Sequence, residues 1–599
     1  MPYATPIQEM QFALGHVAGF DELQGSDAYE DLSDDLVSAI VEEAGKLCDN
    51  VLAPLNWQSD RNGAKLENGV VTTTPGFKEA YQECVDGGWM SLALPKKIGG
   101  QGLPTSLYAL FLESVCAGCV SFSFCPISNF GAIKAIDSVA TDEQRRLYMP
   151  KLVSGEWMTT MNLTEPQSGS DLSELRTKAE PVGDGRYKIS GQKIYITYGD
   201  HDLTENIIHL VLARLPDAPE GTAGISMFLV SKHHVNDDGS LGARNDATCV
   251  SLEEKLGIHG SPTCVMAYGE NGECYGTLLG EENKGLRNMF VMMNSARVDV
   301  GLQGVGVAER SFQHALEYAQ ERRQGRAPGV RTGPMATIYE HNDVRRMLYT
   351  MKALIEASRA ICYTCAVAGD IAKTSPSADR RLEAARLEGL LTPIAKAWST
   401  DRASEVTSFG VQVHGGMGFI EETGAAQYMR DARIFSIYEG TNGIQAIDLV
   451  TRKLLGDKGE AMSKFIAEAR ALGLTAEQSG HDAVKAAASR LKSAIDALSE
   501  STAWLLRTGK ESPDDVLAGA TPYLKQFGNV AGGFYLIKGA LTAVDMLSDQ
   551  DADHGFLETR ILIADFYAQN FLSEAEYMTA AVTAGATRLK PVAPEKFSQ

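Results

Sequence analysis

The spacing of hydrophobic residues changes along this chain of 599 residues. Up to about residue 160 the apolar positions recur at mostly helical spacing, as at 32–40, with a loop at 95–102. From about 161 to 285 the pattern alternates and is rich in β-branched residues, as at 207–212 and 224–230, with Pro, Gly and Asp turns between the runs. From about 286 onward it is helical again. This helix–sheet–helix order predicts an α+β fold.

The same pattern predicts four domains. They are an N-terminal helical domain at 1–160, a central β-barrel or sheet domain at 161–285, a C-terminal helical bundle at 286–454 and an additional helical domain at 455–599. In the last domain, helical spacing is shown by Val484, Ala488, Leu491, Ile495 and Leu498. Residues 451–599 carry 16 Lys and Arg against 19 Asp and Glu, so the basic amphipathic face that membrane binding needs is missing. We expect a helical bundle that packs on the preceding domain.

The composition is that of an ordinary globular protein, with 44% hydrophobic and 22% charged residues. Neither a run of about 18 apolar residues nor a secretory or import signal is apparent, so we expect a cytoplasmic protein. The formal net charge of −22 argues against binding to a phosphate backbone. It leaves room for a small phosphorylated ligand, which needs only a few local cations.

Ten cysteines are too few for a disulfide scaffold in a chain of this length. Two CxxC pairs occur, Cys116/Cys119 and Cys362/Cys365, and both lie in apolar helical stretches. A zinc site needs further ligands at suitable spacing, and no close histidine supplies them. We therefore predict that these cysteines belong to the core and that the protein binds no metal.

A glycine pattern in the third domain resembles a phosphate-binding loop only superficially. Gly301, Gly304 and Gly306 are spaced as GxxGxG, which differs from the dinucleotide fingerprint. They also lie inside a helical pattern instead of between a strand and a helix. We expect these glycines to permit close packing of helices.

A lone carboxylate, Glu439, stands between Tyr438 and Gly440, just ahead of a helical pattern. An enzyme that removes a proton from carbon beside a carbonyl needs one buried base, since burial raises a carboxylate's pKa toward the working range. The adjacent glycine lets a flat ligand approach the backbone closely. The alternative is a solvated acidic residue at a helix N-terminus, which the helix dipole favours. This segment alone leaves both interpretations open.

A turn-rich loop at 163–171 carries hydroxyl groups that could donate to an oxygen-rich ligand, namely those of Thr164, Ser168 and Ser170. An alternating strand follows at 191–197, on which Tyr195 and Thr197 would share one face. An aromatic plane beside a hydroxyl could stack on a flat heterocycle and bond its edge. The alternatives are an ordinary surface turn and a cross-strand pair in a sheet.

Five segments, taken in order, resemble the acyl-CoA dehydrogenase family. They are 164–171, 191–197, 321–324, 412–416 and the stretch from 429 to 441. The resemblance covers roughly residues 35–450, and five segments at compatible spacing are specific where one would be weak. It implies the family's fold and FAD as cofactor. It also implies removal of an α proton and a β hydride from an acyl-CoA thioester, which gives the trans-2-enoyl thioester.

The resemblance implies roles for individual residues. Glu439 would be the catalytic base, with Arg297 near it, and Arg297, Ser170 and Gly440 would contact the substrate. The residues expected around the flavin ring and ribityl chain of FAD are Met161, Leu163, Thr164, Gly169, Ser170, Tyr195 and Thr197. The residues expected to reach the FAD of a neighbouring subunit are Arg322 and Gln324, at its pyrophosphate, and Gln412 and Gly416, across the same interface. Thr441 would make a further FAD contact.

Three positions depart from the family pattern. Tyr195 stands where many members have Trp, so the stacking surface is smaller but still aromatic. Gly325 follows the Arg-x-Gln segment directly, without the usual Phe before glycine, and Gly443 replaces a larger, usually polar residue. These departures affect individual cofactor contacts and leave the expectation of FAD unchanged.

The resemblance also implies partners and a substrate class. Electrons would pass to electron-transfer flavoprotein, and the extra C-terminal domain is associated with homodimers. The chain length and termini resemble the bacterial members that act on 3-methylmercaptopropionyl-CoA in dimethylsulfoniopropionate breakdown. The alternative substrates are short-, medium- or long-chain fatty acyl-CoA thioesters. Met289, Met292 and Met293 could form an adaptable pocket wall or could simply fill the core.

Two relatives with other functions share this domain order. One is a non-dehydrogenating flavoprotein that binds DNA, and the slightly acidic balance of residues 451–599 argues against it. The other is a flavin-dependent oxidase that reacts with oxygen directly, and the sequence leaves this possibility open.

Overall fold

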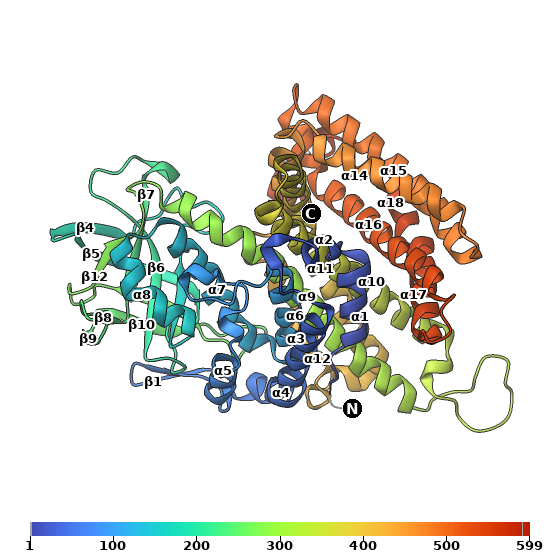
Figure 1. Ribbon diagram of the computed structural model, residues 1–599, viewed down its shortest axis with the longest axis horizontal. Coiled ribbons are helices and arrows are strands. Elements are labelled where there is room, and N and C mark those ends of the chain that lie inside the picture. The colour runs from blue at the N-terminus through green and yellow to red at the C-terminus, as the bar shows by residue number, and fades with distance from the viewer. Residues whose placement is uncertain (1–2, 590, 599) are drawn as a thin grey trace. The chain divides into compact units, whose positions relative to one another are not determined.

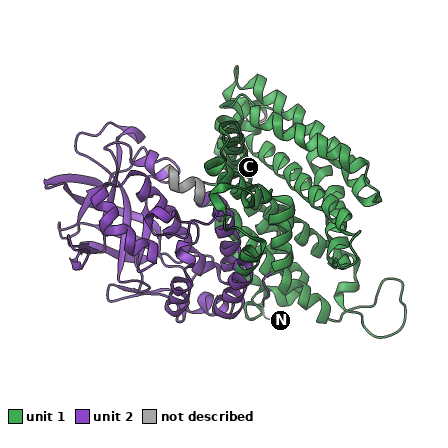
Figure 2. Cartoon of the chain, in the orientation of Figure 1, with its two compact units in different colours: residues 1, 6–39, 300–599 green, residues 2–5, 40–299 purple. Residues whose placement is uncertain are grey.

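A computed structural model describes residues 3–589 and 591–598, and the side chains of 290–295 and 588 lie outside the described set. The described chain divides into two compact units (Figure 2). One consists mainly of residues 40–299, and the other of residues 6–39 and 300–599. Two helices run across this division along the chain, α3 (Asp34–Leu47) and α9 (Gly285–Glu321).

The 40–299 unit begins with helices, labelled in Figure 1. Their bounds are α4 Ala53–Asn62, α5 Phe77–Asp86, α6 Thr105–Gly118, α7 Val120–Val139 and α8 Asp142–Ser154. α6 and α7 are buried along nearly their whole length, in keeping with their continuous apolar sequence. α8 begins at a capping box, in which Gln144 N donates to Thr141 Oγ1 and Thr141 N donates to Gln144 Oε1.

A short hairpin interrupts these helices, formed by β1 (Lys65–Glu67) and β2 (Val70–Thr72). Its turn residues Asn68 and Gly69 have φ values of 53° and 77°, as a two-residue type I′ turn requires. The sequence pattern predicts mostly helices before residue 160 and misses this hairpin. Strands of three residues are too short for their alternation to be visible.

The same unit continues into a sheet that contains eight strands within the described residues. Their bounds are β3 Trp157–Asn162, β4 Lys178–Gly183, β5 Arg186–Thr197, β6 Asn206–Arg214, β7 Ile225–Ser231, β10 Ala247–Leu252, β11 Thr263–Tyr268 and β12 Tyr275–Leu278. The order is β10-β11-β5-β12-β7-β6-β3, and β4 pairs with β5 and β6. β3 runs parallel to β6, and the other long ladders are antiparallel. β8 (His233–Val235) and β9 (Leu241–Arg244) form a separate hairpin.

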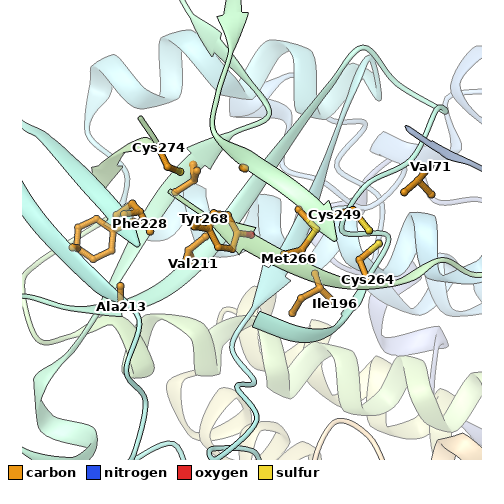
Figure 3. Packing of buried hydrophobic residues seen from close by; sticks show 14 residues of the cluster. Val71, Ile196, Val211, Ala213, Phe228, Cys249, Cys264, Met266, Tyr268 and Cys274 are labelled. Atoms are coloured by element: carbon orange, nitrogen blue, oxygen red, sulfur yellow. The ribbon is translucent and has the colours of Figure 1, made fainter. Parts of the chain in front are cut away.

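The interior of this sheet is filled from several strands. β6 and β7 are buried at almost every position, which explains their mostly apolar sequence. Figure 3 shows part of the core, where Val211, Phe228, Met266 and Tyr268 gather. A sheet packed in this way gives the loops at its edges a rigid support.

β5 is irregular near its end. Its pairing with β11 shifts register between Lys193, which lies opposite Met266, and Ile196, which lies opposite Cys264. Tyr195 has a φ of 61° and is 61% exposed, whereas Lys193 and Ile196 are both buried although they are three residues apart. An extra residue of this kind forms a β-bulge, which redirects side chains. The prediction of a regular strand at 191–197 misses the bulge.

The second unit is helical. Besides its part of α9 it contains α1 Ile7–Phe12, α2 Asp21–Gln24, α10 Asn342–Thr374, α11 Ala378–His414, α12 Ala425–Ala432, α13 Asn442–Asp448, α14 Glu460–Glu477, α15 Asp482–Thr508, α16 Pro513–Met546, α17 His554–Tyr567, α18 Ser573–Tyr577 and α19 Thr579–Val582. The apolar positions that predict α15 are all buried. The predicted α+β class, with a helical addition after the third domain, is confirmed, while the exact domain limits remain a prediction.

Two of the glycines predicted to permit close helix packing, Gly301 and Gly304, lie against α11. A Cβ on Gly301 would lie 2.3 Å from the carbonyl oxygen of Ala395 and 2.9 Å from Cys362 Sγ on α10. A Cβ on Gly304 would lie 3.3 Å from Ala403 Cβ. Gly301 therefore leaves no room for a side chain, and Gly304 leaves little, because the helices approach each other closely.

The cysteines are free and buried. Cys362 and Cys365 lie in α10, as the sequence predicts. Cys116 lies in the last turn of α6, whereas Cys119 lies between α6 and α7 and has an extended backbone with φ −154°. The prediction that this pair lies in one helix is therefore wrong. Across residues 3–589 and 591–598, no group of three or more His, Cys, Asp or Glu side chains is arranged to hold a metal ion. None of the helices in these ranges is long and apolar enough to cross a membrane.

Candidate active site

Glu165 fixes the 163–171 loop within the sheet unit. Its Oε1 accepts hydrogen bonds from Thr177 Oγ1 at 2.6 Å, Thr177 N at 3.0 Å and Lys193 Nζ at 2.9 Å. Its Oε2 accepts from Arg176 N and from Gln167 Nε2, both at 2.7 Å. A single buried carboxylate therefore joins the loop to the segment before β4 and to β5.

The partner of this carboxylate is a fully buried lysine on β5. Lys193 Nζ also donates to the carbonyl oxygen of Leu163 at 3.0 Å, and Ile194 N donates to that of Thr164 at 2.9 Å. Burial opposes the charge on Glu165, but Lys193 and the hydrogen bonds lower the pKa of the carboxyl to about 2. Burial lowers the pKa of Lys193 to about 8 despite the attraction of Glu165. Both groups are charged at neutral pH and hold the loop beside β5.

The sequence-predicted flavin contacts of this unit lie on or near that anchored loop. Met161 is near the end of β3, and Leu163 and Thr164 follow it, all half-buried. Gly169 and Ser170 are exposed on the loop. On β5, the bulge turns the Tyr195 ring outward and Thr197 is half-buried. The segment thus offers an exposed aromatic face and accessible hydroxyls, which fit a flat heterocycle with a polar chain.

A buried polar chain stiffens β3 where Met161 lies. Thr160 Oγ1 and His209 Nδ1 are 2.8 Å apart, Asn162 Nδ2 donates to Thr160 Oγ1 at 2.7 Å, and Tyr268 OH donates to Asn162 Oδ1 at 2.7 Å. Burial lowers the pKa of His209 to about 3, so its ring is neutral at physiological pH. This network keeps the strand before the loop in one position.

In the helical unit, Glu439 lies in a tight loop before α13. Its backbone is left-handed, with φ 55°, and Gly440 follows with φ 81°. Gln445 Nε2 donates to the carbonyl oxygen of Glu439 at 3.2 Å, and Tyr438 OH donates to Gln303 Oε1 on α9. The Glu439 side chain is half-buried. The structure therefore places the predicted base in a conformation that a non-glycine residue rarely adopts.

Residues after the base cap the next helix. Thr441 Oγ1 accepts from Ile444 N at 3.3 Å, as an N-cap residue does. A Cβ on Gly440 would lie 2.8 Å from Gln445 Nε2, so this position favours glycine for space as well as for its positive φ. Thr441 is exposed, but its hydroxyl already has this local role.

The four residues predicted to reach a neighbouring subunit are exposed. Arg322 and Gln324 follow α9, where Gln324 N donates to the carbonyl oxygen of Ala336 at 3.0 Å. Gln412 is in the last turn of α11, and Gly416 follows the helix end. Phe419, three residues on, is 83% exposed.

The predicted substrate contact Arg297 lies in α9 and is buried. Met289, in the same helix, is fully buried, which agrees with core packing. The side chains of Met292 and Met293 lie outside the described residues. The pocket-wall interpretation of this methionine group therefore remains untested.

Sequence reasoning missed the residues that restrain the candidate site. They are Glu165 and Lys193 at the 163–171 loop, and Lys396 and Asn442 at the loop of Glu439, where Lys396 Nζ donates to the Gly440 carbonyl oxygen and to Asn442 Oδ1. Their functions are visible only as contacts between distant segments. One signal was available, because Lys193 interrupts an otherwise apolar inward face of β5 and must have a buried acceptor. Glu165, in the preceding loop, is the carboxylate that serves it.

Four family profiles match successive parts of the chain. They are described as the acyl-CoA dehydrogenase N-terminal domain at residues 36–156, the middle domain at 160–269, the C-terminal domain at 283–455, and an acetyl-CoA dehydrogenase C-terminal-like domain at 459–590. Together they account for most of the chain, including its additional helical part.

Full-length relatives agree with these profiles. The 3-methylmercaptopropionyl-CoA dehydrogenase of Ruegeria pomeroyi is 45% identical over 583 residues, which cover 97% of this chain and 98% of that protein. A butyryl-CoA dehydrogenase of Syntrophomonas wolfei is 35% identical over 582 residues, with 95% of each chain covered. The crystal structure of an acyl-CoA dehydrogenase complexed with FAD from Bacillus anthracis shares the fold, with a TM-score of 0.74, 19% identity, and coverage of 98% of this chain and 93% of that one. This chain therefore belongs to the acyl-CoA dehydrogenase family, flavoprotein oxidoreductases that use FAD and act on a CH–CH bond.

Proposed function

We propose that this chain dehydrogenates an acyl-CoA thioester between its α and β carbons, with Glu439 as the base. The observation that carries this assignment is the left-handed backbone of Glu439, held in a loop that several side chains restrain. Strained non-glycine residues concentrate where a side chain must be aimed at a ligand. Family membership supplies the reaction class in which such a base is needed.

We propose that the flavin binds along the anchored loop and the β5 bulge. The exposed Tyr195 ring supplies a stacking face, and the hydroxyls of Thr164, Ser170 and Thr197 supply polar contacts. Further FAD contacts are assigned to Met161, Leu163, Gly169 and Thr441, and those to the FAD of a partner subunit to Arg322, Gln324, Gln412 and Gly416. When bound, FAD accepts the hydride that leaves the β carbon.

The residues of the chain supply the rest of the chemistry. The Glu439 carboxylate takes the α proton, and Arg297, Ser170 and Gly440 are the proposed substrate contacts. An α proton beside a thioester is only weakly acidic, so donors on the carbonyl oxygen must stabilise the developing enolate. The backbone N–H of Glu439 is one such donor in this proposal. The restrained loop would keep the Glu439 carboxylate and the Glu439 N–H in fixed positions relative to the thioester.

The proposed substrate is 3-methylmercaptopropionyl-CoA. It is supported by the relative from Ruegeria pomeroyi, which is 45% identical over nearly the whole length. A second candidate is a short fatty acyl-CoA, supported by the 35% identical butyryl-CoA dehydrogenase. Because one methylene or a similar small group changes binding by only about 1–3 kcal/mol, we expect some turnover of both.

Electron-transfer flavoprotein is the proposed electron acceptor, and a homodimer in the cytoplasm is the proposed form of the protein. The acceptor follows from the family's chemistry. The homodimer is supported by the additional helical domain, which accompanies dimers among long members. The oxidase alternative predicts rapid flavin reoxidation by air without this acceptor.

The test is flavin bleaching in stopped flow, with 3-methylmercaptopropionyl-CoA and butyryl-CoA as substrates. Glu439→Gln should keep FAD and bind thioester but slow bleaching on the order of 10²–10⁴-fold, because the amide cannot accept the α proton. Glu422→Gln, an exposed glutamate of the same unit, is the matched control and should bleach normally. Bleaching of Glu439→Gln within a few-fold of the unaltered protein would show that another group is the base. A higher kcat/KM for butyryl-CoA would favour the second candidate substrate.

A further inference from the structure

A lysine is completely buried on α11 beside the loop of the proposed base. Lys396 has no exposed surface, and its Nζ donates to the carbonyl oxygen of Gly440 and to Asn442 Oδ1, both at 2.8 Å. A buried ammonium is costly unless its donors are used. Gly440 directly follows Glu439, so the ammonium is hydrogen-bonded to the backbone one residue after the proposed base.

The loop at Glu439 and Gly440 has a backbone conformation that needs support from its surroundings. Glu439 and Gly440 are consecutive left-handed residues, with φ 55° and 81°. A non-glycine residue in this region is strained and stays there only when its surroundings determine it. Gln445 Nε2 also donates to the carbonyl oxygens of Glu439 and Gly440, at 3.2 and 3.5 Å, but it belongs to the helix that follows the loop. Lys396 instead ties the loop to a different, long helix.

Asn442 completes this connection to α11. Its Nδ2 lies 3.0 Å from the carbonyl oxygen of Ala397, 3.1 Å from Thr400 Oγ1 and 2.7 Å from Asp401 Oδ1, and its two N–H groups are shared among these acceptors. Its Oδ1 accepts from Lys396. Both the oxygen and the nitrogen of the side-chain amide therefore bond to residues 396–401 of α11. Since Asn442 is the first residue of α13, the loop is fixed at both Gly440 and the helix start.

We propose that Lys396 is the positioning residue of the base: by holding the Gly440 carbonyl, it fixes the left-handed turn that aims the Glu439 carboxylate at the substrate. This inference rests on the proposed role of Glu439. Lys396 acts through the backbone and touches neither substrate nor cofactor in this account. A side chain of similar length without the ammonium should leave the base present but poorly aimed.

The experiment compares Lys396→Met with Lys396→Gln, whose amide can still donate to the Gly440 carbonyl. FAD content and the melting temperature report folding, thioester titration gives Kd, and stopped flow gives the limiting rate of flavin reduction. Lys396→Met should reduce flavin about 10–100-fold more slowly, with Kd changed less than about three-fold, because misplacing a reacting group costs rate more than binding. Lys396→Gln should recover part of the rate. Lys492→Met, an exposed lysine on α15, is the control.

A limiting rate for Lys396→Met within two-fold of the unaltered protein would overturn the inference, as would equal losses of rate and binding. If Lys396→Met does not fold, Lys396→Gln and Asn442→Ala take its place, and normal rates in both would overturn it equally. Glu439→Gln, measured in parallel, separates the two ideas. If Glu439→Gln is active, the proposed role of Glu439 as the base is wrong. If Glu439→Gln is inactive while Lys396→Met is fully active, only the positioning role of Lys396 is wrong.

Discussion

The Glu165 carboxylate shows how one residue can order a whole loop. It accepts hydrogen bonds from backbone amides, a hydroxyl and an ammonium while almost no water reaches it. A buried ion pair stabilises little in total, but removal of one partner is costly because the other charge stays behind. Glu165 thus fixes a loop that is otherwise rich in Gly, Ser and Pro.

Replacement of Glu165 by Gln should destabilise the sheet unit by about 3–5 kcal/mol, because the Lys193 ammonium would remain buried without its counter-charge. We also expect weaker FAD retention, since the loop bears the proposed contacts Thr164 and Ser170. Thermal melting and FAD loss on dialysis measure the two effects. Glu180→Gln removes an exposed glutamate from β4 and should change neither. Equal melting temperatures for both variants would refute the anchoring role.

Single candidate residues could be selected from sequence where their type was unusual for the position, and their roles stay predictions. A carboxylate between an aromatic and a glycine pointed to Glu439, and an aromatic–hydroxyl pair pointed to Tyr195 and Thr197. Their backbone conformations were not predictable. The left-handed φ of Tyr195 arises from a register shift against β11, and periodicity within one strand carries no information about its partner.

At the scale of elements, the long helices and the buried strands follow from periodicity. α15 keeps its apolar positions on one buried stripe, and β6 and β7 are mostly apolar because both of their faces are covered. The β1–β2 hairpin and the helix break at Cys119 escaped prediction. Each is set by one or two residues, which is less than a period.

The close approach of α9 and α11 makes a prediction about glycine. Gly301→Ala should destabilise the helical unit by about 1–3 kcal/mol, because the new methyl group would overlap the Ala395 carbonyl oxygen. Gly473→Ala on α14 is the matched control. A Cβ there meets nothing within 4 Å, so the better helix propensity of alanine should stabilise by about 0.5–1 kcal/mol. Chemical unfolding of the two variants should therefore shift in opposite directions, and a shared direction would contradict this packing account.

At the scale of the helical unit as a whole, one ion cluster joins segments far apart in sequence. On α1, Glu9 Oε2 lies 2.5 Å from Lys352 Nζ and 3.2 Å from Arg359 Nη1, and Glu9 Oε1 lies 3.6 Å from Arg560 Nη2 of α17. Arg560 also lies 2.8 Å from Glu356 Oε1. The cluster holds the first helix against α10 and against the additional domain.

This cluster predicts a specific dependence of stability on pH. Burial would raise the pKa of Glu9, but Lys352, Arg560 and Arg359 lower it from 4.5 to about 2. A folded-state pKa below the unfolded one gives stability that is present above pH 4.5 and is lost as the pH falls toward 2. Glu9→Gln should therefore cost about 2–4 kcal/mol at pH 7.

The difference in melting temperature between the unaltered protein and Glu9→Gln should be large at pH 7 and shrink below pH 4.5. Glu22→Gln, which removes a more exposed ion pair with Arg380 from the same N-terminal segment, should cost less than about 1 kcal/mol. A Glu9→Gln deficit that is the same at pH 7 and pH 3 would contradict the assignment of the effect to this carboxylate.

The order of helical and sheet regions was predictable from the spacing of hydrophobic residues, and so was the helical character of residues 455–599. The sequence did not predict that residues 6–39 belong to the same unit as residues 300–599. The hydrophobic pattern of residues 32–40 shows a helix but does not show which distant helices will cover it. Charges such as Glu9 and Arg560 read as ordinary surface residues until their partners are known.

The placement of α1 has a consequence for synthesis of the protein. Glu9 leaves the ribosome 343 residues before Lys352, and chains are made at about 5–20 residues per second, so the first helix waits roughly 20–70 s for its first ionic partner. During that time the 40–299 segment can already fold around its sheet. A segment made before the 40–299 unit is therefore among the last to dock, and its apolar face stays without its native cover while that unit folds.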